Sequence, residues 1–595
     1  MTDASVPSVL RVANCSGFYG DRLAAAREMV DGGPIDVLTG DWLAELTMLI
    51  LSKSRTRSAA AGRPDGWART FVTQMEHVMG TCLDKGIKVV SNAGGLNPAG
   101  CAAAVREVAD RLGLAPKIAY VAGDDLMERL PEITASGIDF ANLDTGEAFG
   151  DRSPLTANAY LGAWGIVDAL QRGADIVITG RVTDAAVVVG PAAWHFGWKR
   201  TDWDALAGAV VAGHLIECGP QVTGGNYAFF EEVPGLEYVG FPIAEIHADG
   251  SCVITKHEGS NGLVSVGTVT AQLLYEIGGP AYANPDVVSR FDTIQLTQQG
   301  PDRVLVHGTK GEPAPPTVKV CVNYEGGFRN AMTFCLTGLD IDEKAALVER
   351  TFWPMAGGKD QFDYASMQLW HTAKPDPVTN EEAVAILKFN VKDRDARKVG
   401  RAFANAGVAM SLASYPGMFG MGGPSEAQAY GVYWPTLIPA DLCWNEVVVE
   451  GEKKVVDNTI GSFADPGVIA ASPTLPLPPP KDAPTVRAPI GRVMGARSGD
   501  KGGNANVGVW AKTPEGYAWL SDYLTVERLQ ELMPEARGRE VRRYPLPNLL
   551  AINFVLVGLL EEGVASSTRQ DGQAKGLGEY LRAKVVDVPA SLMTL

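Results

Sequence analysis

The sequence predicts an α/β protein whose N-terminal region is a mainly parallel, Rossmann-like sheet. Five times before residue 190, a short run of β-branched and apolar residues ends at a cluster of glycines, acids and amides. The runs occupy residues 10–13, 35–38, 87–90, 118–121 and 176–178. In a parallel sheet such clusters lie at the carboxyl edge of the strands, where α/β folds bind ligands. The pattern therefore predicts a small-molecule site along one edge of the sheet.

Length and composition exclude several classes of protein. A chain of 595 residues is too long for one hydrophobic core, so several domains are expected. The net charge of -17 argues against a nucleic-acid surface, and no apolar stretch reaches the roughly 18–20 residues of a membrane span. The eight cysteines lack both CxxC spacing and a disulfide framework. We therefore expect a cytoplasmic protein without a metal site.

Changes of composition divide the chain into four segments. The first is the sheet domain and the second a mixed α+β region; a linker with seven prolines and a compact split-βαβ unit follow. Their limits are residues 1–230, 231–470, 471–489 and 490–595.

Local patterns predict the less regular elements. In the first segment we expect a helix at 156–171, and the polar, basic stretch 52–65 is typical of a mobile loop that covers a site. In the second segment, strands at 317–324 and 331–336 flank a Glu-Gly-Gly turn. In the last segment, two strands flank a glycine loop.

That glycine loop, residues 496–506, is the densest polar motif. Its glycines let backbone amides approach an anion, and its Arg and Lys add positive charge. We predict Asp500 and Lys501 as catalytic residues. The loop also supplies predicted binding residues: Arg497, Ser498, Gly499, Asn504 and Asn506. A tight hairpin with solvated charges is the alternative interpretation, and the spacing of a Walker loop is absent.

Two earlier loops, residues 14–17 and 91–100, also have the composition of ligand-binding turns. Residues 91–100 open a helix after a strand, so their amides would favour a phosphate or carboxylate. They lack the full GxGxxG pattern, and a glycine-rich turn without a ligand is the alternative. The predicted binding residues of these two loops are Ser16, Gly17, Asn92, Gly94, Gly95 and Asn97.

A fourth loop places Arg181 and Asp184 at a strand-to-helix turn. Arg181 could hold a carboxylate in bidentate fashion, with Asp184 as a catalytic base or only as a favourable first-turn acid. We predict both as catalytic, with Gly180, Thr183 and, from the next polar loop, Asn226 as binding residues. Cys218 and His214 are better explained as core residues than as a nucleophile and its base.

Six strings in these loops resemble the acyclic terpene utilisation family, AtuA-like: CSGFYGD, TGDWLAE, SNAGGLNP, TGRVTDAA, ECGPQVTGGN and ARSGDKGGNANVGVWA. The resemblance covers essentially the whole chain, with a large family domain to about residue 470 and then a small AtuA-like domain of ferredoxin-like α+β fold. It implies a role in the catabolism of citronellol- and geraniol-type acids as CoA thioesters, alongside a geranyl-CoA carboxylase. It supplies no catalytic residue.

We therefore expect an enzyme that acts on a branched, terpenoid-type acyl-CoA or its carboxylate by hydrolytic, lyase or hydration chemistry. The alternative is a non-catalytic subunit that binds acyl-CoA or associates with an acyl-CoA carboxylase. A nucleotide-dependent ligase is a third hypothesis, weakened by the missing Walker pattern. We expect a homo-oligomer without nucleic-acid or membrane partners, and the sequence leaves any cofactor beyond a CoA thioester substrate open.

Overall fold

The structure is a computed structural model that describes residues 8–60, 62, 65–470, 473–480 and 482–593. The chain divides into two compact units, residues 1–323 with 433–595 and residues 324–432. All the predicted site residues belong to the first unit. Of the proline-rich stretch 471–489, residues 471, 472 and 481 lie outside the described residues, and its last five residues form a strand, β21 (Thr485–Pro489), paired with β26 (Val585–Pro589).

An 11-stranded sheet forms the body of the first unit. Its centre is a run of parallel strands in the order β1-β2-β3-β6-β4. Their bounds are β1 (Val9–Asn14), β2 (Val37–Gly40), β3 (Lys88–Ser91), β6 (Ile176–Thr179) and β4 (Ile118–Ala122). Each corresponds to one of the five predicted runs. β2 and β6 are buried along their whole length, as expected for strands covered on both faces.

Antiparallel strands extend this sheet on both sides, so the prediction of a mainly parallel, Rossmann-like sheet is only partly confirmed. Beside β1 lie β7 (Pro242–His247), β8 (Cys252–Lys256), β12 (Arg303–His307) and β11 (Gln295–Gly300); beside β4 lie β19 (Trp444–Val449) and β20 (Glu452–Asp457). Short connections such as the β7–β8 turn permit only antiparallel pairing. The parallel strand order also differs from that of the dinucleotide-binding sheet.

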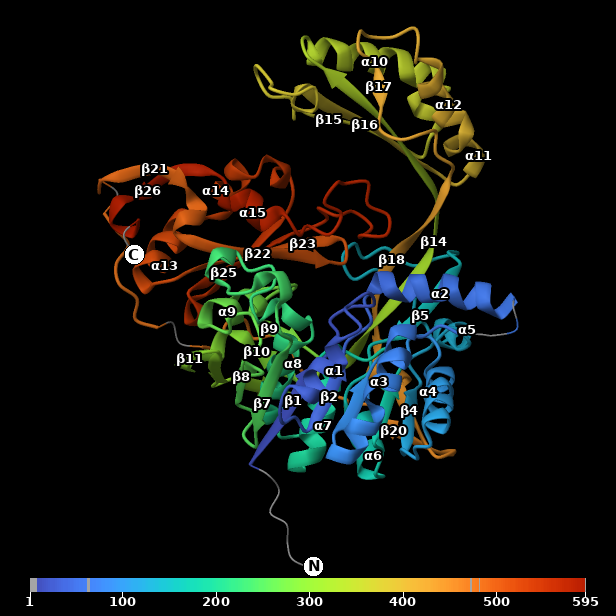
Figure 1. Ribbon diagram of the computed structural model, residues 1–595, viewed down its shortest axis with the longest axis vertical. Helices are drawn as coiled ribbons and strands as arrows, with labels where there is room; N and C mark the ends of the chain where they lie inside the picture. Colours follow the sequence, from blue (N-terminus) through green and yellow to red (C-terminus); the bar gives the residue numbers. More distant parts are fainter. Residues whose placement is uncertain (1–7, 61, 63–64, 471–472, 481, 594–595) are drawn as a thin grey trace, which may run out of the picture. The chain divides into compact units, whose positions relative to one another are not determined.

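Helices cover both faces of the parallel centre (Figure 1). The chain crosses the sheet from β1 to β4 and then returns to β6, which places the helices before β4 and those after it on opposite faces. One set comprises α1 (Ala25–Asp31), α3 (Arg69–Lys85) and α4 (Pro98–Leu112), and the other α6 (Trp164–Gln171), α7 (Ala186–Phe196) and α8 (Trp203–Ile216).

Two predicted elements in this region are wrong. The helix expected at 156–171 is a strand, β5 (Pro154–Ala159), followed by the shorter α6. The loop expected at 52–65 is helical up to residue 60, as part of α2 (Glu45–Ala60), while residues 61, 63 and 64 lie outside the described residues. Its Lys, Arg and Ala are good helix formers, and the Ser58 hydroxyl donates to the Ser54 carbonyl at 2.9 Å within the helix.

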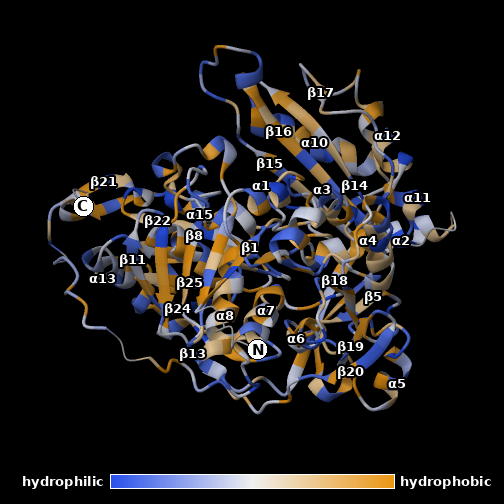
Figure 2. Cartoon of the chain, turned by 60° about the horizontal axis from the view of Figure 1, so that its bottom comes forward, coloured by the Kyte–Doolittle hydropathy of each residue, from blue (hydrophilic) through white to orange (hydrophobic). Residues whose placement is uncertain are grey.

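The C-terminal part of the first unit is an antiparallel sheet of order β22-β23-β25-β24 with its own apolar core. The strands are β22 (Met494–Lys501), β23 (Asn504–Ala511), β25 (Ala551–Leu556) and β24 (Val541–Leu546), and the helices are α13 (Pro514–Tyr523), α14 (Val526–Leu532) and α15 (Leu577–Arg582). Figure 2 shows β25 in the hydrophobic colours, in keeping with its full burial. The predicted glycine loop is therefore a hairpin, in which Lys501 pairs with Asn504.

The second unit contains one long strand where two were predicted. β14 (Thr317–Thr337) runs without a turn through the Glu-Gly-Gly sequence, because Gly326 packs under Tyr430, where a Cβ would stand 2.3 Å from the ring. It pairs with β16 (Val384–Asp393), β17 (Phe419–Gly420) and β18 (Gln428–Pro439), and β15 (Tyr364–Trp370) lies on the far side of β16. Around a core rich in phenylalanine lie α10 (Ile341–Met355), α11 (Ala396–Val399) and α12 (Arg401–Ala409).

Candidate functional site

The carboxyl edge of the parallel strands brings the predicted loops together. The Asp41 N–H donates to the Ser16 carbonyl at 2.9 Å, and the Asn92 side chain donates to the Asp41 carboxyl group at 2.5 Å. The Arg181 N–H donates to the Asp124 carboxyl group at 2.9 Å. Hydrogen bonds therefore link the loops after β1, β2 and β3, and others link those after β4 and β6. This confirms the common edge.

Arg181 is the buried cation of this edge. Its side chain is almost completely covered, at 1% exposure, although Asp184 beside it is one-third exposed. Nη1 donates to Asp184 at 2.7 Å, the guanidinium carbon lies 4.1 Å from the centre of the Tyr160 ring, and Nε has no hydrogen-bond partner in the described part of the chain. Burial lowers the pKa of Arg181, but Asp184 and Tyr160 outweigh it and raise the pKa, so the group stays charged.

A second charged pair lies beside Arg181. The Tyr160 hydroxyl donates to Glu45 at 2.8 Å, and the Lys319 ammonium lies 3.7 Å from the same carboxylate oxygen. Burial raises the pKa of Glu45, but Lys319 and Arg181 outweigh it and lower the pKa to about 2. Glu45 is therefore a carboxylate at neutral pH.

Two further acids, Asp41 and Glu217, are held in the protonated state. Burial, reinforced by the charge of Asp184, raises the pKa of both Asp41 and Glu217 well above their usual values. Glu217 Oε1 lies 3.2 Å from His214 Nδ1, and the Nε2 of His214 faces the Gln272 carbonyl at 3.0 Å. A neutral imidazole donates from Nε2 and leaves Nδ1 as an acceptor, which suits a protonated Glu217.

The imidazole is indeed kept neutral. Burial and the nearby Lys501 lower the pKa of His214 to about 4. His214 packs against the ring of Tyr282 in β9 (Ala281–Ala283), with ring centres 5.4 Å apart. It is therefore a buried histidine with partners, and its proximity to the edge comes from its place in the last turn of α8.

The β22–β23 hairpin carries Asp500 and Lys501 to the same edge. The Lys501 ammonium lies 5.4 Å from the centre of the Tyr282 ring. Burial and, to a smaller extent, the charge of Lys319 lower the pKa of Lys501. Burial and then Glu276 raise the pKa of Asp500 to about 7, while Lys575, 3.5 Å away, opposes them. Both predicted catalytic residues of the hairpin thus lie in the electrostatic field of the sheet edge.

The other predicted residues of the hairpin hold the C-terminal domain in place. Asn506 accepts from the Glu276 N–H at 2.9 Å and donates to the Leu274 carbonyl at 3.0 Å, just beyond α9 (Val266–Leu273). The Asn504 side chain donates to Asp144 at 2.8 Å. Ser498 bonds to the chain around α15, accepting from the Gly578 N–H, and Arg497 stacks over Tyr275.

Glycines have the same docking role. A Cβ at Gly499 would stand 2.6 Å from the Tyr275 ring, and one at Gly508 would stand 2.5 Å from the Leu274 side chain. The hairpin therefore needs glycine so that its backbone can pack closely on the segment after α9. This use of the glycines was not anticipated from the sequence.

Several predicted binding residues of the earlier loops have structural partners. Asn97 caps α4, because its side-chain oxygen accepts from a backbone N–H three residues on at 2.9 Å. A Cβ at Gly94 would stand 2.5 Å from the Thr179 carbonyl oxygen, and one at Gly180 would stand 2.2 Å from Asp124. These two glycines allow neighbouring loops of the edge to meet.

The remaining predicted residues lie on the same set of loops. Gly17 packs against the backbone of Cys218, where a Cβ would come within 2.5 Å, and the Ser16 hydroxyl donates to the Phe18 carbonyl at 3.0 Å. The Thr183 N–H donates to the Leu161 carbonyl at 2.9 Å. Gly95 and Asn226 both adopt left-handed backbone conformations, with φ of 53° and 59°, and Asn226 is exposed.

Five residues of the site were missed by sequence reasoning: Asp41, Glu45, Tyr160, Glu217 and Lys319. Asp41 and Glu45 both belong to the string TGDWLAE, and Glu217 opens ECGPQVTGGN, so the strings themselves marked these three. Lys319 lies in β14, and Tyr160 directly follows β5. Because the sequence predicted both elements incorrectly, no pattern indicated that these two residues belong to the site.

Cysteine chemistry has little support at this edge. Burial and then Glu217 raise the pKa of Cys218 well above its usual value, which disfavours a thiolate nucleophile. Within the described residues, no group of three or more His, Cys, Asp or Glu is arranged to hold a metal ion. Nor does any described helix have the length and apolar character needed to cross a membrane.

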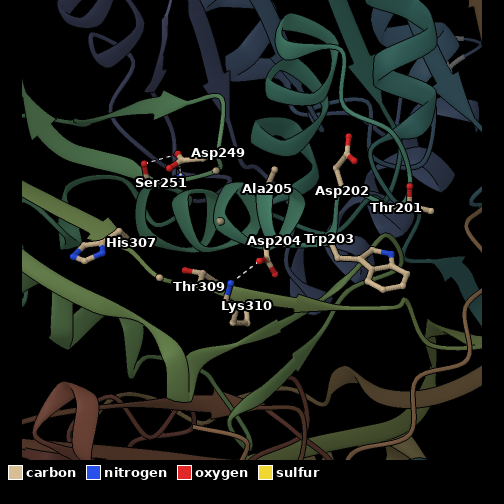
Figure 3. A pocket seen from close by; sticks show the side chains of 13 residues that line it. Thr201, Asp202, Trp203, Asp204, Ala205, Asp249, Ser251, His307, Thr309 and Lys310 are labelled. Atoms are coloured by element: carbon tan, nitrogen blue, oxygen red, sulfur yellow. Dashed lines mark hydrogen bonds and ion pairs between the residues drawn. The ribbon is translucent and has the colours of Figure 1, made fainter. Parts of the chain in front are cut away.

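A hollow of about 730 Å³ lies at the opposite, amino edge of the sheet. It is bounded by the β7–β8 turn, the start of α8 and residues 307–310. Figure 3 shows Asp204 directed toward Lys310, at 2.8 Å, and Asp249 toward Ser251, at 2.7 Å. None of the predicted site residues lines this hollow.

Two protein families match the chain. The family described as acyclic terpene utilisation family protein AtuA matches residues 10–449, and the AtuA ferredoxin-like domain matches residues 488–587. No curated protein and no solved structure matches. The two family matches cover both the sheet with its edge loops and the hairpin domain.

Proposed function

The chain belongs to the acyclic terpene utilisation family AtuA, and from this premise we propose that it is an acid–base enzyme acting on a branched, terpenoid-type acyl-CoA or its carboxylate. The reaction is of the hydration, lyase or hydrolytic kind. The observation that carries the proposal is the buried Arg181 between carboxyl groups whose pKa values are driven in opposite directions.

Arg181 supplies the fixed positive charge for such a substrate. Its Nε has no hydrogen-bond partner among the residues that the structure describes, so it can donate to a thioester or carboxylate oxygen as charge develops there. The ion pair with Asp184 and the stacking on Tyr160 hold the guanidinium plane in place. A donor that is positioned before the reaction needs no reorganisation during it.

The surrounding acids divide the proton-transfer roles. Asp41 and Glu217, with raised pKa values, act as proton donors, whereas Glu45, with its pKa lowered to about 2, acts as a carboxylate base. Hydration of an enoyl group requires one group that activates water and one that protonates carbon. Because the Cys218 thiolate is disfavoured, a hydrolytic route uses an activated water rather than an acyl-cysteine.

The test follows 3-methylbut-2-enoyl-CoA with the full chain by mass spectrometry. Hydration adds one water, hydration followed by lyase cleavage gives acetyl-CoA and acetone, and hydrolysis releases free CoA. Asp41→Asn and Glu217→Gln keep the side-chain shape but remove the acid, and we expect each to lower turnover by about 10²–10⁴-fold. Asp204→Asn at the amino edge is the matched control.

Full turnover by both variants would remove this acid–base assignment. Tight binding without turnover by the wild-type chain would favour the alternative, a non-catalytic subunit that binds acyl-CoA or associates with a carboxylase.

A further inference from the structure

The hairpin tip delivers a lysine amine to the candidate site. Lys501 is the last residue of β22, and at the turn that follows, Gly502 has φ of 63° and packs where a Cβ would stand 3.1 Å from the Tyr433 ring. The Lys501 ammonium lies over the Tyr282 ring, 5.4 Å from its centre. Its position is therefore fixed by packing on both sides of the turn.

Lys501 differs from the neighbouring lysines in having no ion-pair partner among the described residues. Lys575 lies 3.1 Å from Glu276, and Lys319 lies 3.7 Å from Glu45. Carboxylates at Glu276, Glu45 and Asp184 act on Lys501 only from a longer range. A surface lysine without a partner is ordinary, but one among aromatic rings next to a second lysine is not.

This environment favours the neutral amine. Burial and the like charge of Lys319 both lower the pKa of Lys501. A desolvated lysine beside another cation is the arrangement that makes an amine nucleophilic in Schiff-base enzymes. The position of Lys501 next to Lys319, without an ion-pair partner among the described residues, also favours the neutral amine.

We propose that Lys501 forms a Schiff base with the ketone carbonyl of a branched acid or acyl-CoA, so that the site performs lysine-dependent carbon–carbon bond cleavage. This inference rests on the proposed function for its substrate class and narrows the reaction to the lyase type. The ketone is distinct from the thioester carbonyl, which would acylate the amine and release CoA rather than form an imine.

The reaction balances without any oxidant or further cofactor. The Lys501 amine adds to the ketone carbon, and the carbonyl oxygen takes up protons and leaves as water, which gives a protonated imine. The bond between the α and β carbons then breaks, its electron pair moves toward the imine nitrogen, and a β-hydroxyl group loses its proton to a carboxylate as it becomes a carbonyl. Protonation of the enamine and hydrolysis of the imine release the shortened ketone and regenerate the amine.

Pentane-2,4-dione tests the Schiff-base step directly, because its imine rearranges to a stable enaminone that survives peptide mapping. We expect a single adduct on Lys501 at neutral pH, formed at least about tenfold faster than on any exposed lysine. Lys501→Arg keeps the positive charge but cannot condense, so it should lose this adduct. Lys512→Arg is the matched control, since Lys512 lies just after β23 and pairs with Glu232 at 2.5 Å.

Adducts distributed over lysines according to their exposure would overturn the proposal. So would cleavage of the branched β-hydroxyketone 4-hydroxy-4-methylpentan-2-one to acetone by Lys501→Arg at the wild-type rate, which would leave the acid–base proposal at Arg181 intact. Conversely, loss of turnover in Glu217→Gln with an unchanged Lys501 adduct supports the amine independently of the proton donors. Thermal unfolding of Lys501→Arg close to that of the wild type confirms that a lost adduct does not reflect misfolding.

Discussion

The carboxyl and amino edges of the large sheet hold similar residue types in different electrostatic states. At the carboxyl edge, burial raises the pKa of Asp41 and Glu217. At the amino edge, burial also opposes ionisation of Asp204, but the Gly311 N–H and Lys310 outweigh it and lower the pKa. The first environment retains protons on acids, and the second stabilises the carboxylate in an ordinary ion pair.

The hollow and the buried acids with raised pKa values lie at different edges of the sheet. The hollow of about 730 Å³ lies at the amino edge, where Asp204 and Asp249 have close hydrogen-bond partners. Buried polar atoms without a partner in the described part of the chain occur in several regions, and Arg181 Nε and a Glu217 oxygen are the ones beside the acids with raised pKa values. Unsatisfied buried polar atoms are costly, so their presence next to groups with shifted pKa values favours a functional explanation there.

A large effect, comparable to that of the Asp41 and Glu217 variants, should come from Arg181→Lys. The variant keeps a positive charge but loses the planar donor, so we expect turnover of 3-methylbut-2-enoyl-CoA to fall by about 10²–10³-fold. Steady-state kinetics measure the loss, and circular dichroism checks that the variant is folded. Wild-type turnover by this variant would contradict a catalytic role for Arg181 and for the carboxyl edge.

A smaller effect should follow from loosening the domain that completes the carboxyl edge. The Asn553 side chain donates to the carbonyls of Ile277 at 3.1 Å and Gly278 at 2.7 Å. Asn553→Ala leaves these acceptors without their donor, and we expect a loss of about 1–3 kcal/mol in the free energy of unfolding. Chemical denaturation measures it, with Asp587→Asn in an exposed ion pair as the control.

Asp500→Asn should change how stability depends on pH. The pKa of Asp500 is raised to about 7 in the folded chain, so between roughly pH 4 and pH 7 the unfolded chain ionises while the folded chain keeps its proton. Wild-type stability therefore falls as pH rises through this window, and the variant should lack that component.

The difference in unfolding free energy, variant minus wild type, should thus increase from about pH 4 to about pH 7, by on the order of 1 kcal/mol after solvent screening. Thermal unfolding at several pH values measures it. A difference that is constant with pH would contradict the raised pKa of Asp500.

The smallest effect should be that of Asp204→Asn. Asp204 and Lys310 are about half exposed, at 52% and 59%, so the ion pair contributes little. We expect unchanged turnover and a stability change below about 1 kcal/mol, measured by the same kinetics and denaturation. A severe loss of turnover would move the site to the amino edge.

Sequence reasoning succeeded where a pattern was local and repeated. The five parallel strands and their edge loops followed from apolar runs that end in glycine and polar residues. Arg181 was predicted as a site residue because it lies in such a loop, whereas Asp500 and Lys501 were predicted from a glycine-rich string and lie at the end of β22. Glycine strings alone could not separate anion binding from close packing. Gly499 and Gly508 serve packing, which only the contact with Tyr275 and Leu274 shows.

The failures share a physical cause, namely tertiary context that overrides local pattern. β5 pairs with β14 although its sequence was expected to be helical, and β14 continues through two glycines because Tyr430 fills the space beside Gly326. Tyr160 and Lys319 were therefore missed, since both depend on this pairing: the Tyr160 N–H donates to the Lys319 carbonyl at 2.9 Å.

Amide hydrogen exchange with and without 3-methylbut-2-enoyl-CoA tests most directly which edge of the sheet binds the substrate. We expect the ligand to slow exchange in the loops at residues 14–17, 40–45, 91–97 and 180–184 and in the hairpin tip at 499–503. Exchange at residues 201–208, 248–251 and 307–311 should be unchanged. Protection confined to these last three segments, with none in the loops around Arg181, would contradict the account.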